Sequence, residues 1–147
     1  MKLLISILFL LHLNGNPGWL TDMDEAKQEA KAKHEFILLN FSGSDWCGPC
    51  IRLHDEIFGS DIFKQFADGR LVLVNADFPR LKKNQLAKDQ AKRNDALADQ
   101  YNKTGIFPYT LLLDENGKVL KVWEGFYDAG PGAFTEEIKF AMSYKPS

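Results

Sequence analysis

The chain has 147 residues, which is the length of one ordinary domain, and 45% of them are hydrophobic. This composition excludes a disordered chain and a small scaffold held together only by disulfides. The formal net charge of -2 gives no general basic excess, so the sequence does not favour nucleic-acid binding. The two cysteines, Cys47 and Cys50, are too few and too close for a structural framework, and they indicate chemistry instead.

Residues 1–18 are predicted to be a secretory signal peptide. Lys2 precedes the apolar run of residues 3–13, and a segment rich in Gly, Asn and Pro follows it. The run is shorter than the roughly 20 apolar residues that span a bilayer, so no stable membrane span is expected after its removal. A buried N-terminal strand or helix is the alternative. We therefore expect an exported protein of the bacterial periplasm, with one domain over residues 19–147.

The rest of the chain alternates between helical and strand patterns without an internal repeat or a dividing linker. Short apolar runs predict buried strands, and an Asn-Gly turn at residues 114–117 predicts a hairpin between the last two. The expected strands are residues 36–41, 71–76, 109–113 and 118–123. The expected helices are residues 22–33, 47–58, 60–66, 81–103 and 135–143.

Two helix starts and one apolar face can be assigned to particular residues. Thr21 or Asp22 is expected to cap the first helix, and Thr135 the last. The helix after the cysteines is expected to bury an apolar face marked by Ile51, Leu53, Ile57 and Phe58.

Residues 80–103 carry a local excess of positive charge, with seven Lys or Arg against three Asp. The favoured interpretation is a solvated helix face, because charged runs usually lie on the surface. A docking surface for an acidic partner is the alternative.

The chemistry concentrates in the motif Trp46-Cys47-Gly48-Pro49-Cys50. Its spacing lets the two sulfurs meet where the chain enters a helix. Unpaired N–H groups at that helix start stabilise a Cys47 thiolate, the nucleophile of disulfide exchange. Cys50, one turn deeper, can then attack the mixed disulfide and release the reduced partner. Pro49 is tolerated because the first helical turn does not need its N–H.

Two other readings of the cysteine pair are weaker. A zinc site needs more ligands, and His12, His34 and His54 do not complete an obvious four-ligand set, so we expect no metal. An inert structural disulfide is disfavoured because closing so short a loop adds little stability.

With these motifs the sequence resembles the thioredoxin superfamily over roughly residues 26–142. Residues 43–46 and 56–58 are similar to its exported branch, which includes disulfide-reductase domains. The resemblance implies an α/β, thioredoxin-like fold: a central mixed sheet flanked by helices. The segments that carry it are the strand 37–41, the motif 46–50, Gly105-Ile106-Phe107-Pro108 before the strand 109–113, and the hairpin 114–118.

The resemblance also implies roles for residues outside the motif. It places a cis Pro108 opposite Cys47, with the backbone of Phe107 facing an extended client segment and Phe107 and Trp46 forming an apolar rim. Thioredoxins place a buried aspartate on the strand before the motif, and Asn40 stands at that position here. An amide cannot act as a carboxylate base, so Asn40 and the nearby Asp45 are the candidates for a modified proton network.

These observations predict an exported thiol–disulfide oxidoreductase that reduces protein disulfides or relays electrons. No cofactor is expected beyond the Cys47–Cys50 pair itself. The expected partners are disulfide-containing client proteins and a thiol reductant that the sequence does not identify, and the protein is expected to be a monomer. The alternative is a thioredoxin-fold binding or chaperone-like module without significant redox turnover.

Overall fold

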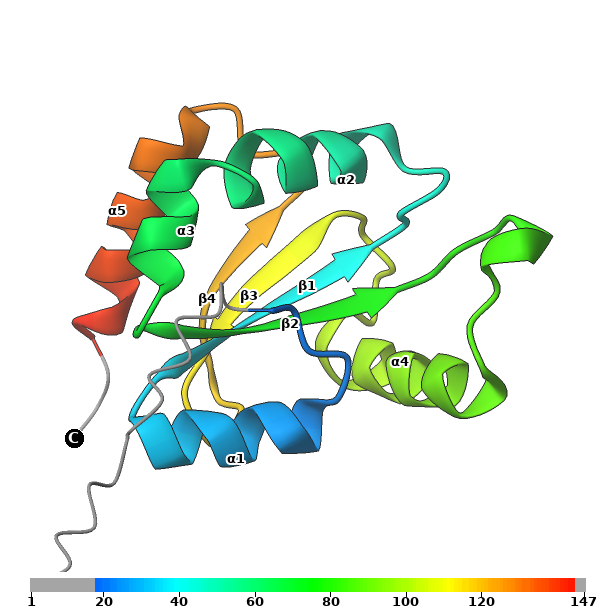
Figure 1. Cartoon of the computed structure of the whole chain (residues 1–147), viewed down its shortest axis with the longest axis horizontal. Coiled ribbons are helices and arrows are strands. Elements are labelled where there is room, and N and C mark those ends of the chain that lie inside the picture. Colours follow the sequence, from blue (N-terminus) through cyan, green and yellow to red (C-terminus); the bar gives the residue numbers. More distant parts are fainter. Residues whose placement is uncertain (1–17, 145–147) are drawn as a thin grey trace, which may run out of the picture.

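A four-stranded mixed sheet forms the centre of the computed structural model, which describes residues 18–144 (Figure 1). The strand order is β2-β1-β3-β4. β1 pairs in parallel with β2, whereas β3 is antiparallel to both β1 and β4. The strands are β1 (Phe36–Ser42), β2 (Leu71–Asp77), β3 (Tyr109–Leu113) and β4 (Val119–Glu124). The predicted central mixed sheet is therefore confirmed.

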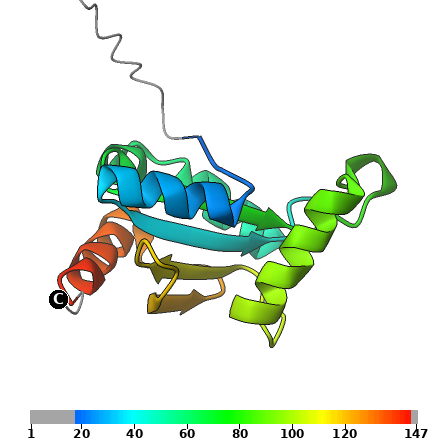
Figure 2. The ribbon, with the colours of Figure 1, turned by 90° about the horizontal axis from the view of Figure 1, so that it is seen from below.

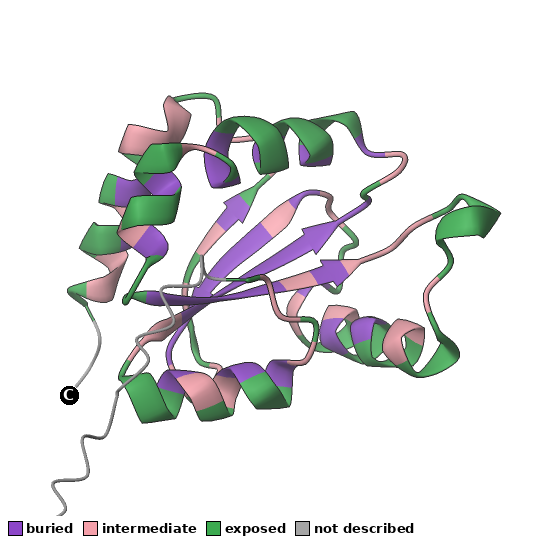
Figure 3. Cartoon of the chain, viewed as in Figure 1, coloured by how far each residue is buried: buried purple, intermediate pink, exposed green. Residues whose placement is uncertain are grey.

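Helices cover both faces of this sheet, which is why the central strands are apolar without alternation. Neighbouring residues of β1 that point to opposite faces, such as Leu38 and Leu39, are both fully buried. Most of β1 is coloured as buried in Figure 3. α1 (Met23–Lys33) and α4 (Lys88–Tyr101) pack on one face. The other face is covered by α3 (Asp61–Ala67), α5 (Gly130–Met142) and η1 (Leu53–Phe58), a π-helix that continues α2 (Gly48–Arg52).

The first helix begins as predicted, but the last does not. Asp22 caps α1, because its carboxylate accepts hydrogen bonds from the backbone N–H groups of Asp24 and Glu25. The prediction that Thr135 caps the final helix is wrong, since α5 already begins at Gly130. Thr135 lies inside α5, where its hydroxyl donates to the carbonyl of Gly132 at 2.9 Å.

The apolar face predicted after the cysteines is confirmed except at one position. Leu53, Ile57 and Phe58 are buried, but Ile51 is 43% exposed. Each residue of a helix is rotated by about 100° from the one before it, so residues two apart point to nearly opposite sides. Ile51 and Leu53 therefore cannot share a face.

The segment predicted as one helix over residues 81–103 forms two elements. A single 3-10 turn, η2 (Lys82–Asn84), precedes α4 and projects beyond the body of the molecule (Figures 1 and 2). Among the described residues, no helix has the length and apolar character to cross a membrane. The predicted signal peptide falls almost entirely on residues 1–17, outside the described residues, and stays a prediction.

Candidate active site

Cys47 and Cys50 form a disulfide at the start of α2, with their Cα atoms 5.2 Å apart. Cys47 is the residue that caps the helix, and its sulfur accepts a hydrogen bond from the backbone N–H of Cys50 at 3.3 Å. Pro49 lies in the first turn, where its missing N–H removes no helical hydrogen bond. The helix start therefore directs an N–H group at the Cys47 sulfur, which favours a thiolate there.

Both cysteines are buried, at 5% exposure for Cys47 and 3% for Cys50. A cavity of about 360 Å³ lies beside Cys50, between β1, β2 and the helix that carries the motif. The walls are mostly apolar, but Asn40, Asn75 and two serines give water or a small polar group several hydrogen-bonding partners. The lining residues are Trp19, Asn40, Ser42, Ser44, Cys50, Ile51, His54, Phe58 and Asn75.

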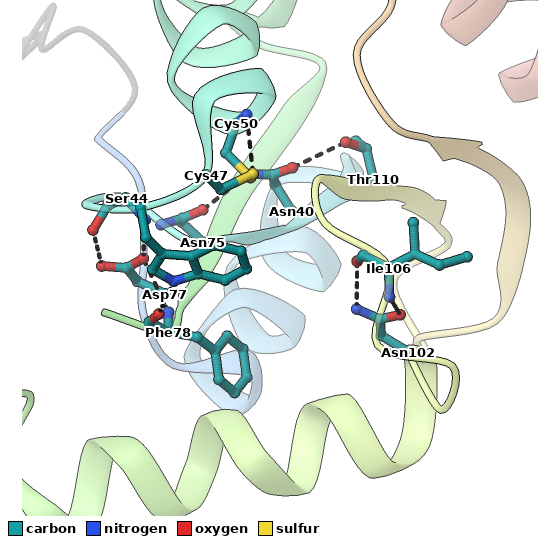
Figure 4. The surroundings of a disulfide bond; sticks show 11 residues. Asn40, Ser44, Cys47, Cys50, Asn75, Asp77, Phe78, Asn102, Ile106 and Thr110 are labelled. Carbon is teal, nitrogen blue, oxygen red and sulfur yellow. Dashed lines mark hydrogen bonds between the residues drawn. A yellow bond between two sulfur atoms is a disulfide. The ribbon is translucent and has the colours of Figure 1, made fainter. Parts of the chain in front are cut away.

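Asn40 is a buried polar residue of β1 on the face that carries the disulfide (Figure 4). Its amide nitrogen donates to Oδ1 of Asn75 at 3.1 Å, and its Oδ1 accepts from the hydroxyl of Thr110 at 3.0 Å. Asn75 on β2 and Thr110 on β3 are its partners in strand register. The three side chains thus form an uncharged polar row across three strands, which satisfies the buried Asn40 amide.

Sequence reasoning proposed Asn40 but missed Asn75 and Thr110. Each is a polar residue within a largely apolar strand, and this interruption of the pattern is the signal that could have identified them. Their meeting depends on strand register between distant segments, which the local pattern does not reveal.

Asp45 lies in the loop before the motif and binds a second loop. Its carboxylate accepts hydrogen bonds from the backbone N–H groups of Arg80 and Leu81, both at 2.9 Å, and from the amide of Asn84 at 3.1 Å. The hydrogen bond from Arg80, with those from Asn84 and Leu81, holds the pKa of Asp45 below its ordinary value. Asp45 thus anchors the 80–84 loop beside the motif, and its role in proton transfer stays a prediction.

Trp46 is held from several sides. Its indole N–H donates to the carbonyl of Phe78 at 2.7 Å, and the Arg80 guanidinium lies 3.6 Å from the centre of its ring. The ring of Phe107 meets it edge-on at 5.5 Å, so the two members of the predicted apolar rim are in contact. Gly43 leaves room for the indole, because a Cβ there would lie 2.3 Å from the ring.

The peptide bond between Phe107 and Pro108 is cis, as predicted. The preceding loop is closed by a reciprocal pair of hydrogen bonds. The Asn102 amide donates to the carbonyl of Ile106 at 2.9 Å and accepts from its N–H at 3.1 Å (Figure 4). Pro108 is buried and its carbonyl accepts from Gly125. The predicted packing of Pro108 near the Cys47 sulfur stays a prediction.

Within residues 18–144, no group of three or more His, Cys, Asp or Glu side chains is arranged to hold a metal ion. His34 and His54 are exposed. The fold and the cysteine pair define the class of thiol–disulfide oxidoreductases in which the pair itself is the redox group.

The chain belongs to the thioredoxin-like domain family, whose family model matches residues 23–141. It is 39% identical over 121 residues to the disulfide bond reductase DsbH of Chlamydia pneumoniae, covering 82% of this chain and 70% of that protein. It is 29% identical over 104 residues to the thioredoxin-related protein DsbJ of the same organism, covering 71% of this chain but 29% of DsbJ.

Solved structures agree with this assignment. A structure of the DsbH oxidoreductase superposes with a TM-score of 0.78 at 37% identity and covers 89% of this chain and 88% of its own. The C-terminal domain of DsbD from Neisseria meningitidis shares the fold, with a TM-score of 0.58, 17% identity and coverage of 84% and 99% of the two chains. The chain is therefore a thiol–disulfide oxidoreductase with Cys47 and Cys50 as its redox pair.

Proposed function

We propose that this protein is an exported reductase of protein disulfides. The observation that carries this proposal is the hydrogen bond from the Cys50 N–H to the Cys47 sulfur at the start of a helix. This arrangement favours the thiolate form of Cys47, which is the form that attacks a client disulfide. The direction of electron flow, from the dithiol to the client, is supported by the 39% identity to a protein named as a disulfide bond reductase.

In the proposed reaction, the Cys47 thiolate attacks one sulfur of a client disulfide and the other client sulfur leaves as a thiolate. Cys50 then loses its proton and attacks Cys47 in the mixed disulfide. The second client sulfur leaves, and the Cys47–Cys50 disulfide forms. The client gains two electrons that the dithiol loses, and an external thiol reductant restores the dithiol.

The client segment is proposed to bind in an extended form beside Phe107 and Pro108. Hydrogen bonds to the backbone of Phe107 would hold the segment in the manner of an added strand, which does not demand one client sequence. The contact between Trp46 and Phe107 supplies apolar surface along the same edge. Gly48 and Pro49 are exposed and add no bulky side chain in front of the disulfide.

Asn40 is proposed to modify proton transfer from Cys50. It lines the cavity beside Cys50 together with Asn75, and neither amide can take up the Cys50 proton as a carboxylate can. Water in this cavity is the proposed carrier of the proton toward solvent. Asp45, whose carboxylate binds the 80–84 loop, is not assigned to this step.

Reduction of insulin disulfides in the presence of a thiol reductant tests the proposal. The wild-type protein should accelerate the reduction and Cys47→Ser should not. Equal rates for both proteins would favour the alternative binding or chaperone-like module. Equilibration with glutathione then gives the potential, and a potential as oxidising as those of disulfide-forming enzymes would reverse the proposed direction.

Export, cleavage near residue 18 and a monomeric state are part of the proposal. Export is tested by expressing the whole chain in a bacterium and determining the N-terminus of the protein recovered from the periplasm. A cytoplasmic protein that keeps Met1 would contradict it. Size-exclusion chromatography with light scattering tests the monomeric state.

A further inference from the structure

Residues 80–88, here called the basic loop, carry four cations and no acidic residue. Arg80, Lys82, Lys83 and Lys88 are all exposed. None of their side chains forms an ion pair with an acidic side chain among residues 18–144. η2, at the centre of the basic loop, projects from the body of the molecule in both ribbon views (Figures 1 and 2). The loop therefore presents positive charge that the protein itself does not neutralise through ion pairs.

The basic loop is fixed in place beside the redox motif. Asp45 accepts hydrogen bonds from three groups of the loop, and the Arg80 guanidinium covers the Trp46 ring at 3.6 Å. Gln85 also donates to carbonyl groups of the chain before it. The loop is therefore held against Asp45 and Trp46, the two residues that directly precede the reactive cysteine.

Three acidic residues adjoin the basic loop and offset part of its charge, but none of them forms an ion pair with its cations. Asp45 directs its carboxylate at backbone N–H groups and the Asn84 amide. Asp77 binds the N–H and hydroxyl of Ser44 and the N–H of Phe78. Asp89 lies in the first turn of α4, which begins at Lys88. Four exposed cations thus remain on one side of the site.

We propose that the basic loop is a docking surface for client proteins that carry an acidic segment next to their disulfide. This inference rests on the proposed function, because it requires that client disulfides react at Cys47. Surface charges of this kind act mainly on the rate of encounter, and salt screens them. A protein client fits better than a membrane surface, because the loop adjoins the cysteine that the client disulfide has to reach.

Cyclic peptides with one disulfide and a flanking run of Glu, Gln or Lys test the proposal. The reduced full-length protein is mixed with each peptide, and its oxidation is followed in a stopped-flow instrument. The Glu peptide should react about threefold to tenfold faster than the Gln peptide at low salt, and the Lys peptide more slowly than both. High salt should bring the three rates together.

The double variant Lys82→Glu/Lys83→Glu should invert this order. Lys31→Glu/Lys64→Glu is the matched control, because it makes the same change in net charge at exposed positions of α1 and α3. The control should keep the preference for the Glu peptide. An inversion in both variants would assign the preference to net charge and overturn the docking surface.

The outcomes separate this inference from the proposed function. If the reduced protein reacts with none of the peptides, the proposed function fails. If it reacts with all three at the same rate at low salt, the basic loop does not select clients and the inference fails. Binding to phosphatidylglycerol vesicles that Lys82→Glu/Lys83→Glu abolishes, together with equal peptide rates, would assign the loop to lipid and overturn it as well.

Discussion

Asn40 and Cys50 line the same cavity, so a buried amide of β1, and not a carboxylate, lies beside the second cysteine of this protein. Both the nitrogen and the oxygen of the Asn40 amide are engaged in hydrogen bonds. The amide is tied to Asn75 on one side and Thr110 on the other. The polar row fixes how Asn40 faces the cavity, and its three side chains add no charge beside Cys50.

Replacing Asn40 by Asp should make the protein more reducing. A carboxylate in the cavity would disfavour a nearby thiolate and raise thiol pKa values by on the order of one unit. It would also assist deprotonation of Cys50 when the mixed disulfide resolves. Because a stabilised thiolate favours the reduced form, the potential should fall, by at most about 30 mV. Equilibration with glutathione measures this change.

Asn94→Asp serves as the control for Asn40→Asp. Asn94 is also a buried amide, but it lies on α4, on the other face of the sheet. The Asn94→Asp variant should leave the redox potential unchanged, although it lowers the stability of the protein. An unchanged potential and unchanged release kinetics for Asn40→Asp would place Asn40 outside the proton network.

Cys50→Ser should accumulate mixed disulfides with clients, whereas Cys47→Ser should accumulate none. The reason is that Cys47 makes the first bond to the client and Cys50 breaks it. Non-reducing electrophoresis followed by mass spectrometry identifies the trapped species. Alkylation of the reduced protein at neutral pH provides an independent measurement, and labelling of Cys50 before Cys47 would reverse the two roles.

Much of the fold could be predicted because its signals are local. The apolar runs of β1 and β2, the Cys-Gly-Pro-Cys motif and the cap at Asp22 each depend on neighbouring residues. The predicted start of α5 is too late because it rested on Thr135 as the capping residue. Gly130 and Pro131 in fact form the first turn, where a proline loses no hydrogen bond. Capping preference alone therefore pointed to Thr135, five residues after the helix begins.

The parts of the site that sequence did not predict depend on contacts between distant segments. Asp45 precedes Trp46 in the chain, yet its partners are Arg80, Leu81 and Asn84. The row formed by Asn40, Asn75 and Thr110 likewise requires the register of three strands. No local pattern carries that information.

Gly43→Ala should destabilise the protein by about 1–3 kcal/mol, because the added Cβ would lie 2.3 Å from the Trp46 ring. The ring would have to move, which weakens its hydrogen bond to Phe78 and its contact with Phe107. Urea denaturation measures the loss of stability. Gly132→Ala is the control, since a Cβ at that helical position meets nothing within 4 Å and should be neutral or stabilising. Equal stabilities for the two variants would contradict the close packing at Gly43.

Glu137 should contribute to the pH dependence of stability. The indole N–H of Trp123 at 2.7 Å, with Tyr127 and Lys121, holds the pKa of Glu137 below its ordinary value of 4.5. A lowered folded-state pKa stabilises the protein above pH 4.5, and this contribution is lost as the pH falls from there through the folded-state pKa. Its size should be below about 1 kcal/mol, because the side chain is 44% exposed.

Glu137→Gln should therefore weaken the acid dependence of the free energy of unfolding and lower stability slightly at neutral pH. Urea denaturation from neutral to acid pH measures both effects. The neighbouring Glu136 is 74% exposed, so Glu136→Gln is a suitable control and should leave the acid profile unchanged. Identical profiles for wild type and Glu137→Gln would show that the contacts with Trp123 and Tyr127 do not favour the charged form.

The position of Trp19 links the order of synthesis to the protection of Cys50. Trp19 forms part of the cavity wall beside Cys50 and packs on Phe58, with ring centroids 5.0 Å apart. It is held there by Leu20, which exchanges backbone hydrogen bonds with β2 at Leu73 and Asn75. A ribosome makes Trp19 early but makes β2 only after both cysteines. The wall beside Cys50 is therefore complete only after β2 has been made and has paired with Leu20.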